Sequence, residues 1–202
     1  MTIPATSPTP RRDASVTHER LLRAALELFT TLGYRGTTTA LVAERAGIAE
    51  GTIYRHFPGK DELFRDLQRS AERWAAGLVA GTAEGERPVA APERLRRVGR
   101  ALLEAAAHDP AQLRMALGGR DEPPPEEKGK PSPREFRDAL QQIVAAGKSD
   151  GVVRAGPAEL WAAVWLALVG TAAERVAAGE WPPEHPHAAL VLDAAWDAIA
   201  SK

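Results

Sequence analysis

The chain has 202 residues, of which 44% are hydrophobic, so it can bury a sizeable core in one or two domains. Its formal net charge is −1, and it contains no cysteine, which excludes disulfides, cysteine–zinc sites and cysteine nucleophiles. No uninterrupted apolar run reaches the roughly 18–20 residues of a membrane span, and the first residues lack the apolar centre of a signal peptide. We therefore expect a cytoplasmic protein without a membrane partner.

The first residues, MTIPATSPTPRRD, are rich in Pro, Thr and Ser. This composition predicts a disordered N-terminal arm over residues 1–13. Arg11 and Arg12 are candidates for contacts with a phosphate backbone, as in other basic arms. The favoured interpretation is that they only keep the arm soluble.

Residues 20–57 carry the pattern of three helices, with a short second and third helix around a glycine turn. Gly33 fits the end of the first helix, and the hydroxyl of Thr38 can cap the second. Gly47 supplies the turn, and the third helix runs from about Ala49 to His56, where Pro58-Gly59 stops it. This is the skeleton of a helix-turn-helix, a motif that reads duplex DNA. The apolar face of the first helix comprises Leu21, Leu22, Ala25, Leu28 and Phe29.

This segment resembles the DNA-binding domain of the TetR family of transcriptional regulators. The matching residues are Ala25, Phe29, Gly33-Tyr34, Thr37-Thr38, Val42-Ala43, Ala46-Gly47-Ile48, Gly51-Thr52-Ile53-Tyr54, His56-Phe57, Lys60 and Leu63. Position 49 departs from the family, because it holds Ala where a capping Ser or Thr is usual, and losing such a cap costs roughly 0.5–2 kcal/mol. The resemblance implies an all-α protein. A helix-turn-helix DNA-binding domain over 14–60 is then followed by a helical ligand-binding and dimerisation domain over 61–202.

The motif and the resemblance together assign the residues that contact DNA. The start of the second helix at Thr38 can hold a phosphate, and Tyr54, His56 and Lys60 match phosphate-contacting or basic positions of the family. Base reading falls to the exposed positions of the third helix, where Gly51 allows close approach and Arg55 can pair with a guanine or hold the backbone. The candidate DNA-binding residues are Thr38, Thr39, Glu50, Gly51, Thr52, Tyr54, Arg55, His56 and Lys60.

Each of these residues also has a structural interpretation. Thr38 could only cap its helix, Tyr54 could be a half-buried aromatic residue, and Arg55 could be a solvated charge. Glu50 is acidic and faces an anionic partner, so a structural or selectivity role weighs as much as a base contact. Residues 1–60 carry eight Lys/Arg and five Asp/Glu, so they are positive while the remainder is negative. This charge distribution matches a DNA-binding domain joined to a body that does not bind DNA.

Beyond residue 60 the composition predicts helices throughout. Ala, Leu, Arg and Glu dominate, and alternating β-branched runs are missing. A helix continues from Lys60 to about residue 80, and the segment 118–133, GGRDEPPPEEKGKPSP, predicts a loop that is mobile without a ligand. The later helices are expected at about 92–108, 110–118, 133–148, 157–178 and 185–200.

The last two predicted helices carry wide apolar stripes that must be buried. In TetR-like proteins these helices pair with their copies and form a four-helix dimer interface. Two copies then place two recognition helices one DNA turn apart on a palindromic operator. Alternatively, both helices only close the core of one chain. The candidate dimer-interface residues are Trp161, Val164, Trp165, Leu168, Leu190, Val191 and Ala194.

In the same family, helices of the central body enclose a small-molecule effector. We expect such an effector to favour a conformation whose recognition helices are wrongly spaced for the operator, so that the ligand releases a repressor from DNA. The candidates lining a pocket are Trp74, Leu78, Leu102, Leu103, Met115, Phe136 and Leu140. Each of them is explained more readily as core.

Sequence motifs of enzymes are missing: there is no HExxH, no G-x-S-x-G and no Walker-type loop. We expect no enzyme and no cofactor, and His185-x-His187 is too weak a pattern to assign a metal site. The alternative function is a helical ligand-binding or interaction protein whose DNA head lacks specific operator recognition. A non-specific DNA-compacting protein is a further alternative, which the near-neutral net charge disfavours.

Overall fold

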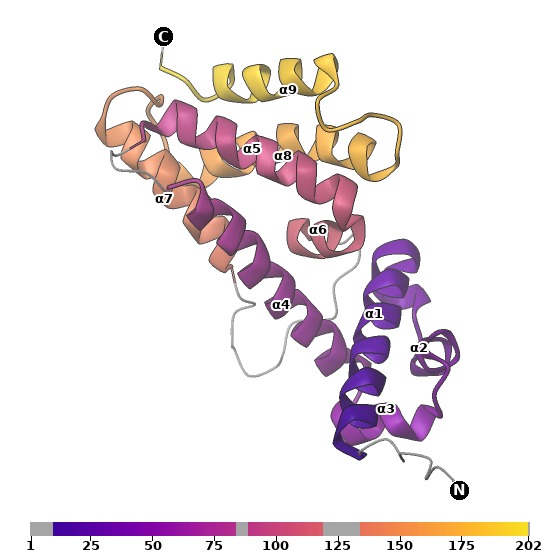
Figure 1. Ribbon diagram of the computed structural model, residues 1–202. Helices are drawn as coiled ribbons and strands as arrows, with labels where there is room; N and C mark the ends of the chain where they lie inside the picture. The colour runs from indigo at the N-terminus through magenta and orange to yellow at the C-terminus, as the bar shows by residue number, and fades with distance from the viewer. Residues whose placement is uncertain (1–9, 84–88, 119–133, 202) are drawn as a thin grey trace, which may run out of the picture. The chain divides into compact units, whose positions relative to one another are not determined.

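The structure is a computed structural model that describes residues 10–83, 89–118 and 134–201. Within these ranges the chain forms only helices and one isolated bridge between Val153 and Ala200, which confirms the all-α prediction (Figure 1). The helices are α1 (Pro10–Gly36), α2 (Thr39–Ala46), α3 (Glu50–His56), α4 (Lys60–Gly81), α5 (Ala91–His108), α6 (Pro110–Leu117), α7 (Glu135–Ser149), α8 (Ala158–Ala177) and α9 (Pro186–Asp197).

The chain divides into two compact units inside α4. Among the described residues, one unit comprises 10–67 and Gly118, and the other comprises 68–83, 89–117 and 134–201. The first unit therefore holds α1, α2, α3 and the start of α4. The second holds the remainder of α4 together with α5 to α9.

The first helix begins earlier than the sequence pattern indicates. It starts at Pro10, so residues 10–13 of the arm expected over 1–13 are helical, while residues 1–9 lie outside the described residues. Proline suits a first helical turn, because an N–H there has no partner inside the helix. At the other end Gly33 leaves helical geometry with φ 77° and ψ 171°, a conformation that a side chain would strain.

Hydroxyl groups and a glycine set the bounds of α2. Thr37 is fully buried, and its hydroxyl donates to the Gly33 carbonyl over 2.8 Å. The Thr38 hydroxyl accepts from the Leu41 amide and caps the helix, as predicted. Gly47 then ends α2 in the left-handed region with φ 64°, which confirms the predicted turn.

A compact apolar core holds the first unit together. Phe29 of α1 packs edge-on against Phe64 of α4, with ring centroids 5.1 Å apart. The other fully or nearly buried apolar side chains include Leu21, Ala25, Val42, Ile53, Phe57 and Leu63. Ile53 is the sole buried residue of α3 and anchors that helix, Thr52 is half-buried, and the other residues of the helix are exposed.

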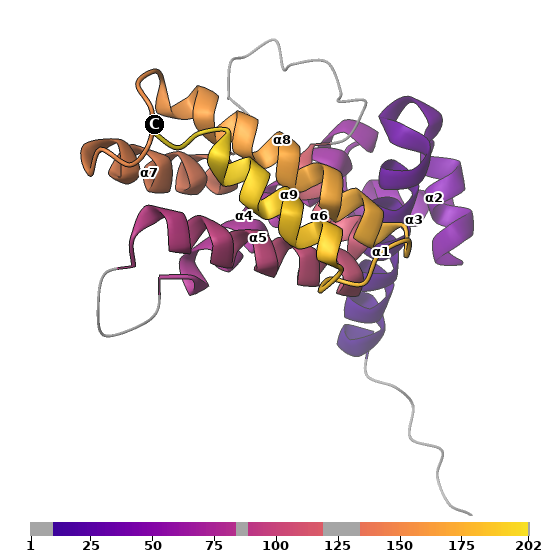
Figure 2. The ribbon, with the colours of Figure 1, turned by 90° about the horizontal axis from the view of Figure 1, so that it is seen from above.

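In the second unit, α8 packs against α5, α7 and α9 (Figure 2). Its inner face carries Trp165, Val169 and Ala172, all buried. Gly99 of α5 lies against α9, because a Cβ there would meet the side chain of Leu192. Helix α9 ends at Asp197, short of the predicted residue 200, because the chain turns to pair Ala200 with Val153.

Helix α8 is also long and apolar enough to cross a membrane, by length and composition alone. Its uninterrupted apolar run is shorter than a membrane span, because Glu159, Glu174 and Arg175 lie near the ends of the helix. A core helix of a soluble protein passes the same test, and one face of α8 forms part of the core just described. The predicted mobile loop 118–133 lies outside the described residues except for Gly118.

Candidate nucleic-acid interface

The two short helices α2 and α3 follow α1 in the first unit (Figure 1). Their exposed side chains form a mainly polar surface. On α3 the side chains of Glu50, Tyr54, Arg55 and His56 are exposed, and Tyr54 retains 53% of its accessible surface. Four neighbouring exposed polar side chains on a seven-residue helix leave room for a partner. The structure thus places most of the sequence-predicted DNA contacts together.

The start of α3 has no side-chain cap. Ala49 occupies the cap position and makes no side-chain hydrogen bond, and only its carbonyl accepts from the Thr52 amide over 2.9 Å. The departure from the family pattern at position 49 therefore has the expected local consequence. The helix is held instead by Ile53 and by contacts of its exposed side chains with α2.

A chain of hydroxyl groups joins α2 to α3. The Thr39 hydroxyl donates to Oε1 of Glu50 over 2.7 Å, and the Thr39 and Tyr54 hydroxyl oxygens lie 3.2 Å apart. A carboxylate only accepts, and Thr39 has a single hydroxyl hydrogen. Because that hydrogen goes to Glu50, Tyr54 must be the donor to Thr39.

Lys60 stands at the start of α4, as the family resemblance implies, and its side chain is bound within the protein. Its Nζ donates to the carbonyls of Tyr34 and Thr37 over 2.9 Å and 3.0 Å, and it lies 4.0 Å from the centroid of the Tyr34 ring. Two of the three ammonium hydrogens are used inside the protein. Lys60 therefore joins the α1–α2 turn to the start of α4, and a phosphate would compete with these contacts, so its contact with DNA stays a prediction.

Tyr34 of α1 makes a further contact with the start of α4. Its hydroxyl donates a hydrogen bond to Asp61. Burial is the largest cause and the Asp61 carboxylate is the next, and together they raise the pKa of Tyr34 to about 12. Sequence reasoning noted Tyr34 only as a family match and did not single out Asp61. The signal that could have found this pair is the position of Asp61, directly after Lys60.

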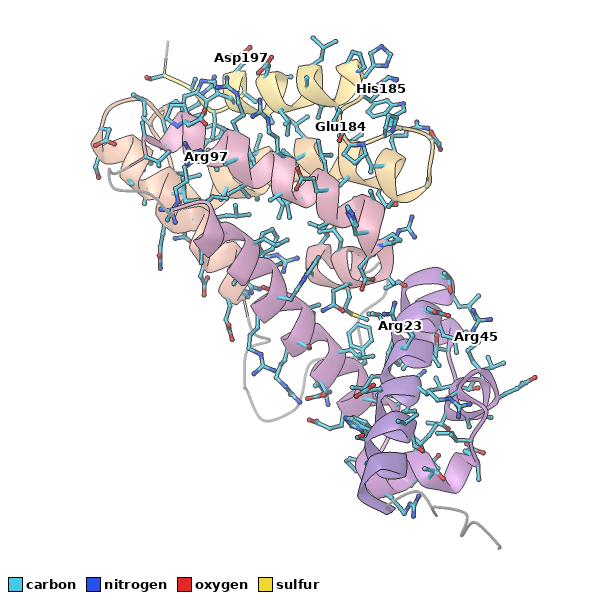
Figure 3. The ribbon with its side chains drawn as sticks, viewed as in Figure 1. Arg23, Arg45, Arg97, Glu184, His185 and Asp197 are labelled. Atoms are coloured by element: carbon cyan, nitrogen blue, oxygen red, sulfur yellow. The ribbon has the colours of Figure 1, made fainter. Side chains whose placement is uncertain are left out.

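The cationic side chains of the first unit differ in whether they have a bonding partner within the protein. Arg45 of α2, labelled in Figure 3, forms an ion pair with Glu27 of α1 over 2.7 Å, so its charge already has a partner within the protein. Arg55 is exposed and has no hydrogen bond or ion pair among the described residues. The exposed His56 ring lies 5.1 Å from the His18 ring of α1. Arg55 is therefore the cation of α3 best placed for an external anion.

The predicted pocket residues all lie in the second unit. Trp74 and Leu78 are half-buried, whereas the others are almost fully buried: Leu102, Leu103, Met115, Phe136 and Leu140. These five side chains pack as core in this conformation. The structure thus supports the interpretation, already favoured for each, that they stabilise the fold.

One predicted dimer-interface residue is wrong. Trp165 is only 1% exposed within a single chain, so it belongs to the core of the second unit. The apolar stripe of α8 is wide enough to cover two faces, and periodicity could not tell the inner one from the outer. Leu190 of α9 is 64% exposed and Ala194 is also exposed, while Trp161, Val164, Leu168 and Val191 are half-buried.

His185, labelled in Figure 3, forms an aromatic cluster with His187 and Trp181 at the start of α9. His185 stacks on Trp181 with ring centroids 5.1 Å apart, and its Nδ1 accepts from the His187 amide over 3.2 Å. One imidazole nitrogen of His185 is therefore used as a helix cap. This arrangement gives the histidine pair a structural role.

A buried acid that no sequence pattern identifies joins three helices of the second unit. Glu72 of α4 is 1% exposed and accepts from the Phe136 amide over 3.0 Å and from Arg137, both on α7. Arg137 also donates to the carbonyl of Leu117, at the end of α6, over 2.8 Å. Glu72 and Arg137 are too far apart in the sequence for a local pattern to pair them.

Comparison with known proteins agrees with the helix-turn-helix geometry. Residues 21–67 match the family described as bacterial regulatory proteins, tetR family. The uncharacterized HTH-type transcriptional regulator YvkB of Bacillus subtilis (strain 168) is 37% identical over 94 residues, which is 46% of each chain. The HTH-type transcriptional repressor KstR2 of Mycobacterium tuberculosis is 36% identical over 97 residues, again 46% of each chain. The matching part thus spans about half the length of these curated relatives.

Solved structures resemble the fold over nearly the whole chain. A TetR family transcription regulator from Marinobacter aquaeolei VT8 has a TM-score of 0.73 at 18% identity, covering 95% of this chain and 100% of that one. The ketosteroid transcriptional regulator KstR2 of Mycobacterium tuberculosis has a TM-score of 0.58 at 22% identity, covering 98% and 99%. These relatives are regulators and not enzymes, as expected for this chain. Residues 21–67 thus carry the helix-turn-helix of the tetR family of bacterial regulatory proteins, and the whole chain shares the fold of these solved regulators.

Proposed function

We propose that this chain is a DNA-binding transcriptional repressor that binds a palindromic operator as a homodimer and is released by a small-molecule effector. The observation that carries the proposal is the surface of α3, which buries Ile53 alone and exposes Tyr54, Arg55 and His56. A single helix fits the major groove of B-DNA, where each base pair presents its own donors and acceptors. The curated relative named as a repressor supports repression as the mode of regulation.

The homodimer is supported by the outer surfaces of α8 and α9. Leu160 of α8 is 49% exposed and Leu190 of α9 is 64% exposed, although both are large and apolar. Apolar side chains gathered on neighbouring helices are typical of a protein–protein contact. A second copy of the chain is the partner that a palindromic operator requires.

The effector is proposed to bind in the second unit, near the half-buried side chains of Trp74 and Leu78. Its chemical identity stays open. A ligand acts only through its differential affinity for two conformations, so the effector must favour one that binds the operator poorly. A repressor of this kind works where the chromosome is, and for a bacterial regulator that is the cytoplasm.

The test is selection of bound sequences from a random duplex DNA pool by the full-length protein. Enrichment of one palindrome, with half-sites about one helical turn apart, would support a dimeric operator-specific regulator. No enrichment at low or moderate salt would contradict operator recognition and favour a helical interaction protein. Equal retention of all sequences would favour a non-specific DNA-compacting protein.

Lys60 and Arg55 are expected to separate structural from DNA-contacting cations. Lys60→Met removes two charged hydrogen bonds and should lower the free energy of unfolding by about 2 kcal/mol. It should leave the salt dependence of DNA binding unchanged, whereas Arg55→Met should reduce that slope by about one unit without a loss of stability. Denaturant unfolding and binding titrations between 50 and 200 mM salt, roughly the range in which the slope is clear, measure both.

The opposite pattern would contradict these roles. If the salt dependence of DNA binding falls by about one unit in Lys60→Met while stability stays normal, Lys60 contacts a phosphate. A stability loss in Arg55→Met would show that Arg55 has a structural partner.

Gly51 is expected to matter for the approach to DNA. A Cβ at this position meets nothing within 4 Å, so Gly51→Ala should raise stability by about 0.5–1 kcal/mol. The same methyl group should weaken operator binding by about 1 kcal/mol or more if α3 lies close to the groove floor. Gly77→Ala is the matched control, because its Cβ also meets nothing within 4 Å and it lies in the second unit. If Gly51→Ala binds the operator as well as Gly77→Ala, the close approach is ruled out.

A further inference from the structure

The direction of hydrogen donation at the α2–α3 surface points to the role of Glu50. The Tyr54 hydroxyl donates to Thr39, and the Thr39 hydroxyl donates to Oε1 of Glu50. The Tyr54 hydrogen thus goes to Thr39, and the Thr39 hydrogen goes to the carboxylate of Glu50. We call Tyr54, Thr39 and Glu50 the hydroxyl chain.

This arrangement leaves neither hydroxyl with a hydrogen for an outside acceptor. A phosphate oxygen only accepts, so it cannot bind Thr39 or Tyr54 while their hydrogens serve Glu50. The hydroxyl of Tyr54 is therefore a positioning group here, in contrast to the phosphate contact that its family position implies. Its effect is to fix the carboxylate of Glu50 through Thr39.

The outer carboxylate oxygen of Glu50 is still available. Oε1 holds the Thr39 hydroxyl, no hydrogen bond to Oε2 occurs among the described residues, and the side chain is exposed. Glu50 forms no ion pair within the described ranges, unlike Glu27, which is paired with Arg45. A fixed, unpaired carboxylate on the surface offered to DNA repels phosphate, so it needs a hydrogen-bond donor on a base.

We propose that Glu50 is a specificity-determining residue that accepts a hydrogen bond from the N4 amine of a cytosine in the major groove. The inference rests on the proposed function, because it assumes that α3 enters that groove. The hydroxyl chain holds the carboxylate in place before DNA arrives. Thr39 and Tyr54 act on specificity only through Glu50.

Cytosine is the base that a carboxylate suits best. Guanine presents two acceptors in the major groove, and thymine presents an acceptor and a methyl group. Adenine has an amine, but the N7 acceptor beside it repels a second carboxylate oxygen. Cytosine offers its N4 amine without a neighbouring acceptor. A base pair without cytosine at this position leaves the charge of Glu50 unsatisfied.

The experiment repeats the selection from a random duplex pool with full-length protein and its variants Glu50→Ala, Thr39→Val and Glu44→Gln. The unaltered protein should enrich a palindrome with cytosine at one position of each half-site. Glu50→Ala should lose that preference by about 5- to 150-fold and keep the others. Thr39→Val should weaken the same preference, but should change nothing there when combined with Glu50→Ala.

Glu44→Gln is the charge control, because it removes an exposed acid from α2 outside the hydroxyl chain. It should leave the preference for cytosine intact. A binding titration on the selected operator gives a second measurement. Exchanging the cytosine for thymine should weaken the unaltered protein about 5- to 150-fold and Glu50→Ala far less.

Failure of this inference is distinguishable from failure of the proposed function. If the unaltered protein and Glu50→Ala enrich the same palindrome with the same base at every position, Glu50 reads no base and the regulator stands. A preference that depends on Glu50 but selects another base would also overturn the assignment to cytosine. If the unaltered protein enriches no palindrome, the proposed function fails and this inference fails with it.

Discussion

Arg137→Ala is expected to lower the free energy of unfolding at neutral pH by on the order of 3 kcal/mol. The carboxylate of Glu72 is 1% exposed and has two donors among the described residues, Arg137 and the Phe136 amide. Removing the guanidinium leaves a buried negative charge with the amide alone. The substitution also removes the contact with the Leu117 carbonyl.

The free energy of unfolding lost in Arg137→Ala should depend on pH, because it depends on the protonation of Glu72. Burial raises the pKa of Glu72 above its ordinary value of 4.5, although Arg137 acts to lower it. A raised pKa means that the folded chain binds this proton more tightly than the unfolded chain. The stabilisation that this tighter proton binding contributes is therefore fully present below pH 4.5 and is lost as the pH rises through the raised pKa of Glu72.

In Arg137→Ala the lowering influence of the guanidinium disappears, so the pKa of Glu72 should rise further. The deficit of the variant should then shrink on acidification from neutral pH towards the ordinary value of 4.5. Urea unfolding of full-length protein at several pH values measures this change. Arg134→Ala is the control, because its ion pair with Glu159 is long and exposed, and it should cost at most about 0.5 kcal/mol. A deficit of equal size at every pH would contradict a role for the charge of Glu72.

Leu190→Glu is expected to convert the proposed homodimer into monomers and to weaken operator binding by at least about 100-fold. Leu190 is 64% exposed in a single chain, so the substitution should leave the fold intact. A charge placed in an apolar interface loses its hydration without gaining a partner. A monomer then binds with one recognition helix where a dimer uses two.

Light scattering and operator titration measure the two effects of Leu190→Glu. Gln141→Glu places the same charge on an exposed position of α7 and should leave both unchanged. Trp165→Glu is unsuitable as an interface test, because a charge at this 1% exposed site should unfold the chain. A Leu190→Glu protein that keeps the mass of a dimer would remove α9 from the interface.

Local patterns predicted the helices well for a physical reason. Helical periodicity and glycine turns are properties of neighbouring residues, so Gly47 and the Thr38 cap could be identified from the sequence. The face on which a side chain lies depends on what packs against it. The apolar stripe of α8 contained Trp165 and Leu160 alike, and only the fold shows that Trp165 is buried and Leu160 is half exposed.

The candidate site shows the same limit. The exposed positions of α3 were predictable, because a short helix anchored by Ile53 must expose its other faces. The hydrogen bonds of Lys60 could not be predicted, since their acceptors are two carbonyls more than 20 residues earlier in the chain. The direction of the hydroxyl chain likewise depends on the distances between α2 and α3.

The contacts of Arg137 also couple two helices that are separate in the sequence. The carbonyl of Leu117, at the end of α6, and the amide of Phe136, at the start of α7, are both bound, directly or through Arg137, to the single carboxylate of Glu72. One side chain of α4 thus holds the end of one helix and the start of the next. Local opening of α6 and of α7 should therefore be correlated, and hydrogen exchange at the two helix ends should speed up together when either partner of this ion pair is removed.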